Sequence, residues 1–188
     1  MGISELGYPN RIICLTEETT ETLYLLGEQE RIVGISGFTH RPPEARKQKP
    51  KVSAFVEADI PKIEALSPDL ILAFSDIQAD ITRELVARGH NVYTFNQRSL
   101  AEILQAIVLI GSLVGKQKEA EVLAANLRAR LEELKRVATQ LPRRPRVYFE
   151  EWPDPMISGI RWVSELVELV GGDDIFVEKS RIISLIMY

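Results

Sequence analysis

The stretch Asp69-Leu-Ile-Leu-Ala-Phe-Ser-Asp76 decides the fold of this chain. Its central residues, Leu70–Phe74, form a near-continuous apolar run with polar residues on both sides. Such a run is typical of a strand that is buried on both faces, as in a parallel sheet covered by helices. We therefore expect neighbouring parallel strands, and the helices that connect them, on either side of this stretch.

Short apolar runs alternate with amphipathic stretches over residues 11–95. Strand–helix alternation with short connections predicts parallel pairing with right-handed crossovers. The predicted fold class is therefore α/β, with a doubly wound parallel sheet in an N-terminal lobe of residues 1–98. The other strands expected in this lobe are Arg11–Leu15, Ile32–Ile35, Lys51–Ser53 and Val92–Phe95.

Residues 99–141 carry a helical pattern that only Gly111 and Gly115 interrupt, and they are predicted to form a spine helix region. The pattern has a broad apolar face at first and a narrower leucine stripe later. A coiled coil is the alternative interpretation of that stripe, but the repeat is too short to form one alone.

Residues 142–188 begin a second α/β lobe. We expect a strand at Arg146–Glu150, a loop at Glu151–Ser158 and a helix at Ile160–Val170. One strand and one helix cannot form an independent sheet, so this lobe is predicted to be incomplete.

The composition excludes several classes of protein. A net charge of −4 and a pI near 5.4 argue against a nucleic-acid-binding protein. Cys14 is the only cysteine, so no intrachain disulfide can form, and its apolar neighbours predict a buried, inert thiol. Residues 1–10 lack the features of an export signal, which predicts a cytoplasmic location for the chain as written; removal of a leader would instead place it in the periplasm or at the cell surface.

Catalytic and metal-binding motifs are absent from the sequence. No nucleophile elbow, phosphate-cradling glycine loop or metalloprotease helix occurs, so we do not expect an enzyme. His40 and His90 are the only histidines, and one histidine with a few glutamates is a thin ligand set for a metal ion. We therefore predict no metal site and no required cofactor.

Five strings in fixed order carry a resemblance to a known family. The chain resembles the helical-backbone substrate-binding proteins of ABC importers for cobalamin and iron complexes, and cobalamin-binding members above all. The match covers nearly all of residues 11–178, and the resemblance implies that the second lobe is C-terminally truncated. The strings are Arg11-Ile-Ile-Cys-Leu-Thr-Glu-Glu-Thr-Thr-Glu-Thr-Leu23, Val33-Gly-Ile-Ser-Gly-Phe-Thr-His-Arg-Pro-Pro43, Ile63-Glu-Ala-Leu-Ser-Pro-Asp-Leu-Ile-Leu72, Glu151-Trp-Pro-Asp-Pro-Met-Ile-Ser-Gly159 and Leu169-Val-Gly-Gly-Asp-Asp-Ile-Phe176.

Ligands of open α/β sheets bind beyond the carboxyl ends of the strands. Aromatic side chains at those ends suit a large, partly planar ligand such as a corrin or porphyrin. The resemblance also assigns Arg41, Phe55, Phe74 and Trp152 to ligand-contacting positions, although the family pattern has an aromatic residue where this chain has Arg41. Core packing is the alternative role for Phe74. The candidate ligand-binding residues are Phe38, His40, Arg41, Phe55, Phe74 and Trp152.

These expectations lead to a non-enzymatic binder of cobalamin or a related corrinoid or tetrapyrrole. A ferric-siderophore or haem binder is an alternative, because Arg41 could pair with carboxylates and His40 could ligate a metal. A truncated remnant that only self-associates is another, since the unfinished lobe predicts a homodimer. The resemblance implies docking on an ABC permease through a glutamate after Asp59-Ile60, but Pro61 stands there and argues against it.

Overall fold

The structure, a computed structural model, describes residues 7–154 and 156–176 and divides the chain into two compact units. The first unit contains residues 1–96 and 106–121, and the second contains residues 97–105 and 122–188. The two units differ in how much apolar surface they bury. Among the described residues of the second unit, the buried apolar side chains are Leu104, Ala124 and Val163, whereas the other buried apolar side chains belong to the first unit.

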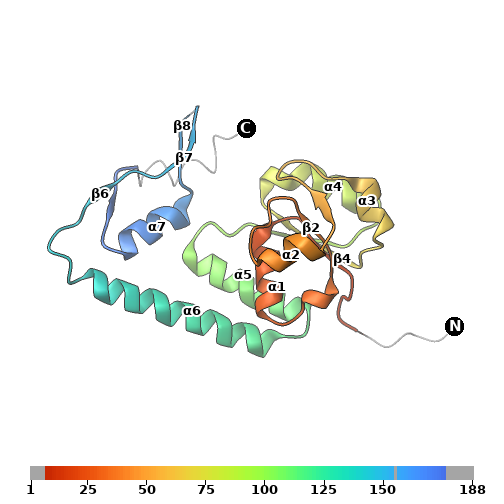
Figure 1. Ribbon diagram of the computed structural model, residues 1–188, viewed down its shortest axis with the longest axis horizontal. Coiled ribbons are helices and arrows are strands. Elements are labelled where there is room, and N and C mark those ends of the chain that lie inside the picture. The colour runs from red at the N-terminus through yellow and green to blue at the C-terminus, as the bar shows by residue number, and fades with distance from the viewer. Residues whose placement is uncertain (1–6, 155, 177–188) are drawn as a thin grey trace. The chain divides into compact units, whose positions relative to one another are not determined.

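A five-stranded parallel sheet forms the centre of the first unit (Figure 1). The strand order is β3-β2-β1-β4-β5, and the apolar run Leu70–Phe74 forms β4. All five predicted strands are present, so the prediction of a doubly wound α/β lobe is confirmed. The strands are β1 (Ile12–Cys14), β2 (Ile32–Ser36), β3 (Lys51–Ser53), β4 (Leu70–Phe74) and β5 (Val92–Phe95).

The strand order reverses between β1 and β4, which are neighbours in the sheet although two strands separate them in sequence. The chain moves from β1 outward to β2 and β3, and then from β4 outward to β5 in the other direction. Right-handed crossovers in opposite directions place their helices on opposite faces of the sheet. The connecting helices are α1 (Glu17–Leu25), α2 (Pro43–Gln48), α3 (Ile60–Ala65) and α4 (Ala79–Ala87), with short 3-10 turns η1 (Gln29–Arg31) and η2 (Asp76–Gln78).

One core cluster fixes α3 and α4 against the sheet. Ile13 and Ile71 from adjacent strands are fully buried beside Ile63 of α3 and Leu85 of α4. Burying a side chain of this size contributes roughly 1.5–3 kcal/mol, so this cluster is a main source of the stability of the first unit.

The predicted spine contains two helices, α5 (Leu100–Leu113) and α6 (Gln117–Ala138), rather than one. Gly115 has φ +75 in the turn between them, a conformation that glycine adopts without a steric penalty. Gly111 serves a different purpose, because a Cβ atom there would lie 2.3 Å from the Cβ of Ala120. Both glycines are thus required by the tight turn between α5 and α6.

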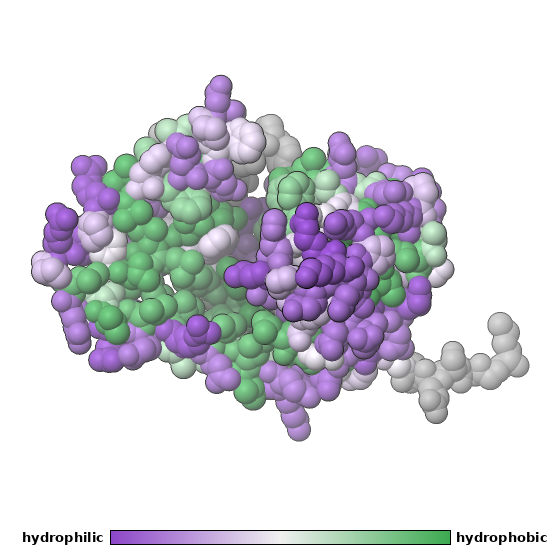
Figure 2. All heavy atoms as spheres, viewed as in Figure 1, coloured by the Kyte–Doolittle hydropathy of each residue, from purple (hydrophilic) through white to green (hydrophobic). Residues whose placement is uncertain are grey.

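The second unit contains two small pairs of strands and one further helix, α7 (Arg161–Leu169). β6 (Arg146–Val147) pairs in parallel with β9 (Asp173–Asp174). The predicted loop at Glu151–Ser158 is wrong, because β7 (Glu150–Pro153) and β8 (Met156–Ser158) form an antiparallel hairpin. Figure 2 shows apolar side chains gathered on the visible face of this unit around α7.

Candidate ligand-binding edge of the first sheet

The carboxyl ends of all five strands of the first unit lie along one edge, because the strands are parallel. The strand order reverses between β1 and β4, and ligands of open α/β sheets bind outside the strand ends at such a reversal. Thr16 and Glu17 follow β1 at this point, and Phe74 ends β4. The edge at these two strand ends is therefore the candidate site of the first unit.

Three of the predicted aromatic side chains are at this edge. Phe38 follows β2 and is 56% exposed, and Phe55 follows β3 and is 44% exposed. Phe74 is half-buried, an exposure intermediate between that of a core residue and that of a freely accessible ligand contact. Exposed aromatic rings at strand ends offer flat apolar surfaces that a ligand with a broad ring system could cover.

Gln78 joins the loops that carry two of these rings. It is fully buried in η2, its Oε1 accepts a hydrogen bond from the Phe74 backbone N–H at 3.0 Å, and its Nε2 donates to the Phe55 carbonyl at 3.0 Å. The same Nε2 donates to the Leu15 carbonyl at 3.3 Å, just after β1. Sequence reasoning did not find this residue, because a glutamine in an amphipathic stretch carries no signal that it is buried.

The backbone after β4 is in an unusual conformation. Ser75 has φ 55 and ψ −177, a region that side chains other than glycine rarely occupy. Its N–H donates to the Phe95 carbonyl at 2.6 Å, and its Oγ accepts from the Ile77 N–H at 3.3 Å. Strained residues of this kind concentrate at functional sites, which adds weight to the end of β4 as part of one.

Arg41 lies among carboxylates rather than alone. Its guanidinium is 3.2 Å from Glu21 and 3.6 Å from Glu17, both on α1. The arginine side chain is 70% exposed, so these ion pairs are screened by solvent and add little stability. The positive charge of Arg41, which the sequence suggested as a partner for an anionic ligand, is thus already paired with two glutamates of the same unit.

Other acidic groups near the end of β1 influence a buried thiol. Thr16 donates a hydrogen bond to Glu18 at 2.8 Å at the start of α1. Cys14, at the end of β1, is fully buried, which confirms the predicted burial of its thiol. Burial above all, with a smaller contribution from the charge of Glu18, raises the pKa of Cys14 to about 12.

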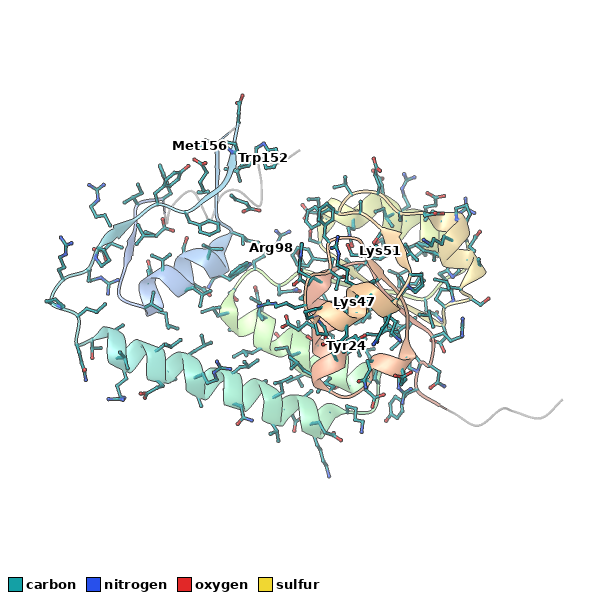
Figure 3. The ribbon with its side chains drawn as sticks, in the orientation of Figure 1. Tyr24, Lys47, Lys51, Arg98, Trp152 and Met156 are labelled. Atoms are coloured by element: carbon teal, nitrogen blue, oxygen red, sulfur yellow. The ribbon has the colours of Figure 1, made fainter. Side chains whose placement is uncertain are left out.

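Trp152 belongs to the second unit, on the hairpin of β7 and β8 (Figure 3). It is 58% exposed, and its indole Nε1 donates to the Asp154 carbonyl at 3.0 Å. Burial raises the pKa of the neighbouring Glu151 above its usual range. Trp152 thus belongs to a different unit from Phe38, Phe55 and Phe74.

His40 is exposed in the loop before α2. Within residues 7–154 and 156–176, no three histidine, cysteine or carboxylate side chains gather as metal ligands. Across the same residues, no helix combines the length and the apolar character that crossing a bilayer requires.

Comparison with known proteins gives one family match. The family model described as "Periplasmic binding protein" matches residues 12–184. A curated relative, the uncharacterized ABC transporter substrate-binding lipoprotein YvrC of Bacillus subtilis, is 30% identical over 155 residues, which are 79% of this chain and 49% of the relative. A vitamin B12-binding protein of Vibrio cholerae is 29% identical over 173 residues, 90% of this chain and 62% of that protein. The chain thus spans less than two thirds of either relative.

Solved structures show the same fold. The periplasmic vitamin B12 binding protein BtuF of Vibrio cholerae aligns with a TM-score of 0.78 and 26% identity, covering 92% of this chain and 68% of that chain. The periplasmic heme-binding protein RhuT of Roseiflexus sp. RS-1 aligns with a TM-score of 0.80 and 22% identity, covering 90% and 67%. The similar proteins thus include binders of two kinds of tetrapyrrole-like ligand.

Proposed function

The chain belongs to the periplasmic binding protein family, and from that premise we propose that it binds cobalamin or a related corrinoid. Proteins of this family bind solutes and are not enzymes, which confirms the sequence-based expectation of a non-enzymatic protein. Cobalamin is then a ligand and not a cofactor, since no reaction of this chain requires it.

The observation that carries the proposal is the aromatic edge of the first unit. Phe38 and Phe55 are exposed and Phe74 is half-buried, all at carboxyl ends of parallel strands. Flat rings offer large contact areas at a small cost in side-chain entropy, which suits a ligand with a broad ring system. Vitamin B12-binding proteins are among the relatives that align over most of this chain.

The charges at this edge favour a corrinoid over haem or a carboxylate siderophore. Arg41 is the cation that sequence analysis offered for such a ligand, but Glu17 and Glu21 compensate its charge. Haem has two carboxylates that need cationic partners, whereas the periphery of a corrin ring has mainly neutral amides. The carbonyl groups of these amides can accept hydrogen bonds from Arg41, and their N–H groups can donate hydrogen bonds to the glutamates. Both the cation and the carboxylates at this edge can therefore bind the ligand.

Haem is the second candidate ligand. Heme-binding structures share the fold, and exposed His40 could ligate an iron or cobalt ion from the loop before α2. We rank it second because the arginine that would bind the haem carboxylates is already paired with acids.

The proposals for the location of the protein and for its docking on an importer also rest on the family. The relatives include an ABC transporter substrate-binding lipoprotein, and solved relatives are periplasmic, so we propose the periplasm or cell surface as the place of action. We expect weak docking on an importer, because Pro61, at the first turn of α3, stands where the family resemblance implies a glutamate.

A homodimer remains the proposal for the second unit. Several of its apolar side chains are exposed, and its strand pairs β6–β9 and β7–β8 are each two-stranded. A second copy that covers this surface would remove apolar area from water. Light scattering that shows a monodisperse monomer would contradict this proposal. The exposed apolar residues include Leu134, Val137, Leu141, Phe149, Val170 and Ile175.

The deciding experiment is an absorbance titration of the purified chain with cobalamin, followed by desalting, with haem and a ferric chelate in parallel. Corrin absorbance retained at close to one equivalent supports the proposal. Loss of cobalamin with retention of haem selects the second candidate. Loss of all three ligands from a chain that circular dichroism shows to be folded favours the remnant, a structural module that binds none of them.

A further inference from the structure

Gln78 lies at the point where the strand order of the first unit reverses. It leaves β4 through η2, yet its side chain reaches the carbonyl of Leu15 just beyond β1. It is fully buried, and its amide makes hydrogen bonds with three separate segments of the chain. A buried side-chain amide has two donors and one carbonyl acceptor, and all the polar atoms of this one are used.

Two of the three partners are backbone groups of the aromatic residues at the edge. The Phe74 N–H donates to Gln78 Oε1, and the Phe55 carbonyl accepts from Gln78 Nε2, each at 3.0 Å. Phe55 and Phe74 come from strands that are not neighbours, since β2 and β1 lie between β3 and β4. The glutamine therefore sets the distance between two backbones that the sheet ladder does not join directly.

The strained backbone of Ser75 needs such support. Its φ of 55 is costly for a residue with a side chain and persists only where surrounding contacts hold it. Contacts on both sides do so here: the Ser75 N–H binds the Phe95 carbonyl, and the preceding Phe74 N–H binds Gln78. Loss of the Gln78 amide would free the turn that aims the Phe74 ring.

We propose that Gln78 is a positioning residue that fixes Phe55 and Phe74 relative to one another before a ligand binds. Its importance for ligand affinity rests on the proposed function, but its effect on the two rings does not. A ligand that meets fixed rings loses less side-chain entropy on binding, so the amide raises affinity without touching the ligand.

The first test is a measurement on the ligand-free protein. Fluorophenylalanine introduced at the six phenylalanines gives a ¹⁹F NMR signal for each, assigned with single Phe→Leu variants. Gln78→Met keeps the length of the side chain but removes the amide. We expect the signals of Phe55 and Phe74 to broaden or shift, while that of Phe149 in the second unit stays unchanged.

The matched control is Leu85→Ala, which removes a fully buried side chain of α4 that belongs to the core cluster. It lowers stability without removing any hydrogen bond at the edge, so the Phe55 and Phe74 signals should remain as in the wild type. If Leu85→Ala disturbs both signals as much as Gln78→Met does, the effect is one of stability and the positioning role is refuted. Gln78→Asn, which keeps the amide on a shorter side chain, replaces Gln78→Met if that variant does not fold.

The second test is a double-mutant cycle on cobalamin affinity. Gln78→Met should weaken binding about tenfold in the wild-type background and much less in a Phe55→Ala/Phe74→Ala background, because the rings that it positions are gone. Equal losses in both backgrounds would refute the proposal. A wild type that binds no cobalamin would refute the proposed function alone, since the ¹⁹F measurement then decides whether Gln78 positions the rings.

Discussion

Arg41 Nη2 lies 3.2 Å from Glu21 Oε2, and Arg41 Nε lies 3.6 Å from Glu17 Oε1. The loop after β2 is thus joined to α1 by a cation between two carboxylates, and the carboxylates outnumber the cation in this cluster. This arrangement has a direct consequence for the ligands that the edge can accept.

The double variant Glu17→Gln/Glu21→Gln should shift the ligand preference of the edge toward anionic ligands. The guanidinium of Arg41 is then free to pair with a carboxylate of haem, so we expect haem affinity to rise by about tenfold. Cobalamin affinity should change by no more than about twofold, because the new glutamine carbonyls can still accept hydrogen bonds from its neutral amides. Parallel absorbance titrations with the two ligands measure both effects.

The control for this prediction is Glu133→Gln on α6, which breaks an exposed ion pair with Arg136 within the second unit. It should leave both affinities as in the wild type. A fall in haem affinity in the double variant would mean that the acids orient Arg41 rather than compete for it.

The buried thiol of Cys14 makes stability depend on pH in the alkaline range. Its pKa is 9.0 in an unfolded chain and about 12 in the folded protein, because burial disfavours the thiolate. Below pH 9 both states are protonated and the full stability is present. As the pH rises from 9 toward 12, only the unfolded state loses its proton, so stability falls by up to about 1.4 kcal/mol per pH unit from this group.

Urea unfolding at several pH values between 8 and 11 checks this slope, with Cys14→Ala as the reference. Tyrosines and lysines also titrate there, but they are present in both proteins. We expect the wild type to lose stability more steeply than Cys14→Ala above pH 9. Parallel curves would show that the thiol ionises equally in the folded state, and native-state labelling by iodoacetamide would then be fast.

The strands of the first unit could be predicted because burial on both faces leaves a strong signal. Leu70–Phe74 and Ile12–Leu15 are apolar over their whole length, which is typical of short strands buried on both faces. The predicted strands also fix where each strand ends, so the sequence alone assigns Phe38, Phe55 and Phe74 to the carboxyl edge of the sheet.

The parts that sequence reasoning missed depend on contacts between distant segments. Gln78 bonds with Leu15 and Phe55, both far away in sequence, and no local pattern predicts such partners. The hairpin of β7 and β8 is short, and every residue of β7 is exposed. It therefore lacks the alternation of apolar and polar residues that marks a half-buried strand. The pairing of Arg41 with α1 likewise required the fold.

Gly111→Ala should destabilise the protein although alanine is the better helix former. A Cβ atom at this position would lie 2.3 Å from the Ala120 Cβ and 2.8 Å from the Lys116 carbonyl oxygen, so the turn between α5 and α6 must open. Overpacking of this kind costs about 1–3 kcal/mol and exceeds the gain of about 1 kcal/mol in helix propensity. Chemical denaturation measures the difference.

Gly27→Ala is the informative comparison for this variant. Gly27 has φ +75 but no atom within 4 Å of an added Cβ, so only backbone strain of about 1 kcal/mol is expected. The double variant Gly111→Ala/Ala120→Gly should recover part of the loss, because it removes the methyl group that the new Cβ meets. Failure to recover would mean that the Lys116 carbonyl, and not Ala120, limits the turn.

Alanine substitutions of the aromatic residues predicted from the sequence should differ in their effects on ligand affinity and on the stability of the fold. Phe55→Ala removes an exposed ring, so we expect unchanged stability and a loss of about 1–2 kcal/mol in cobalamin binding. Phe74→Ala should lower both, since the ring is half-buried and also contributes to packing. Trp152→Ala, on the exposed hairpin of the second unit, should lower affinity with unchanged stability. Absorbance titration and urea unfolding of each variant provide the two readouts.

Phe149→Ala provides the control, because Phe149 is 44% exposed, as is Phe55, but was not assigned to the ligand. Its affinity should equal that of the wild type. If Phe55→Ala and Phe74→Ala bind cobalamin as the wild type does, the aromatic edge is not the binding surface and the corrinoid proposal loses its main support. If only Trp152→Ala keeps full affinity, the first unit binds the ligand without that residue, and the assignment of Trp152 from the family resemblance is wrong.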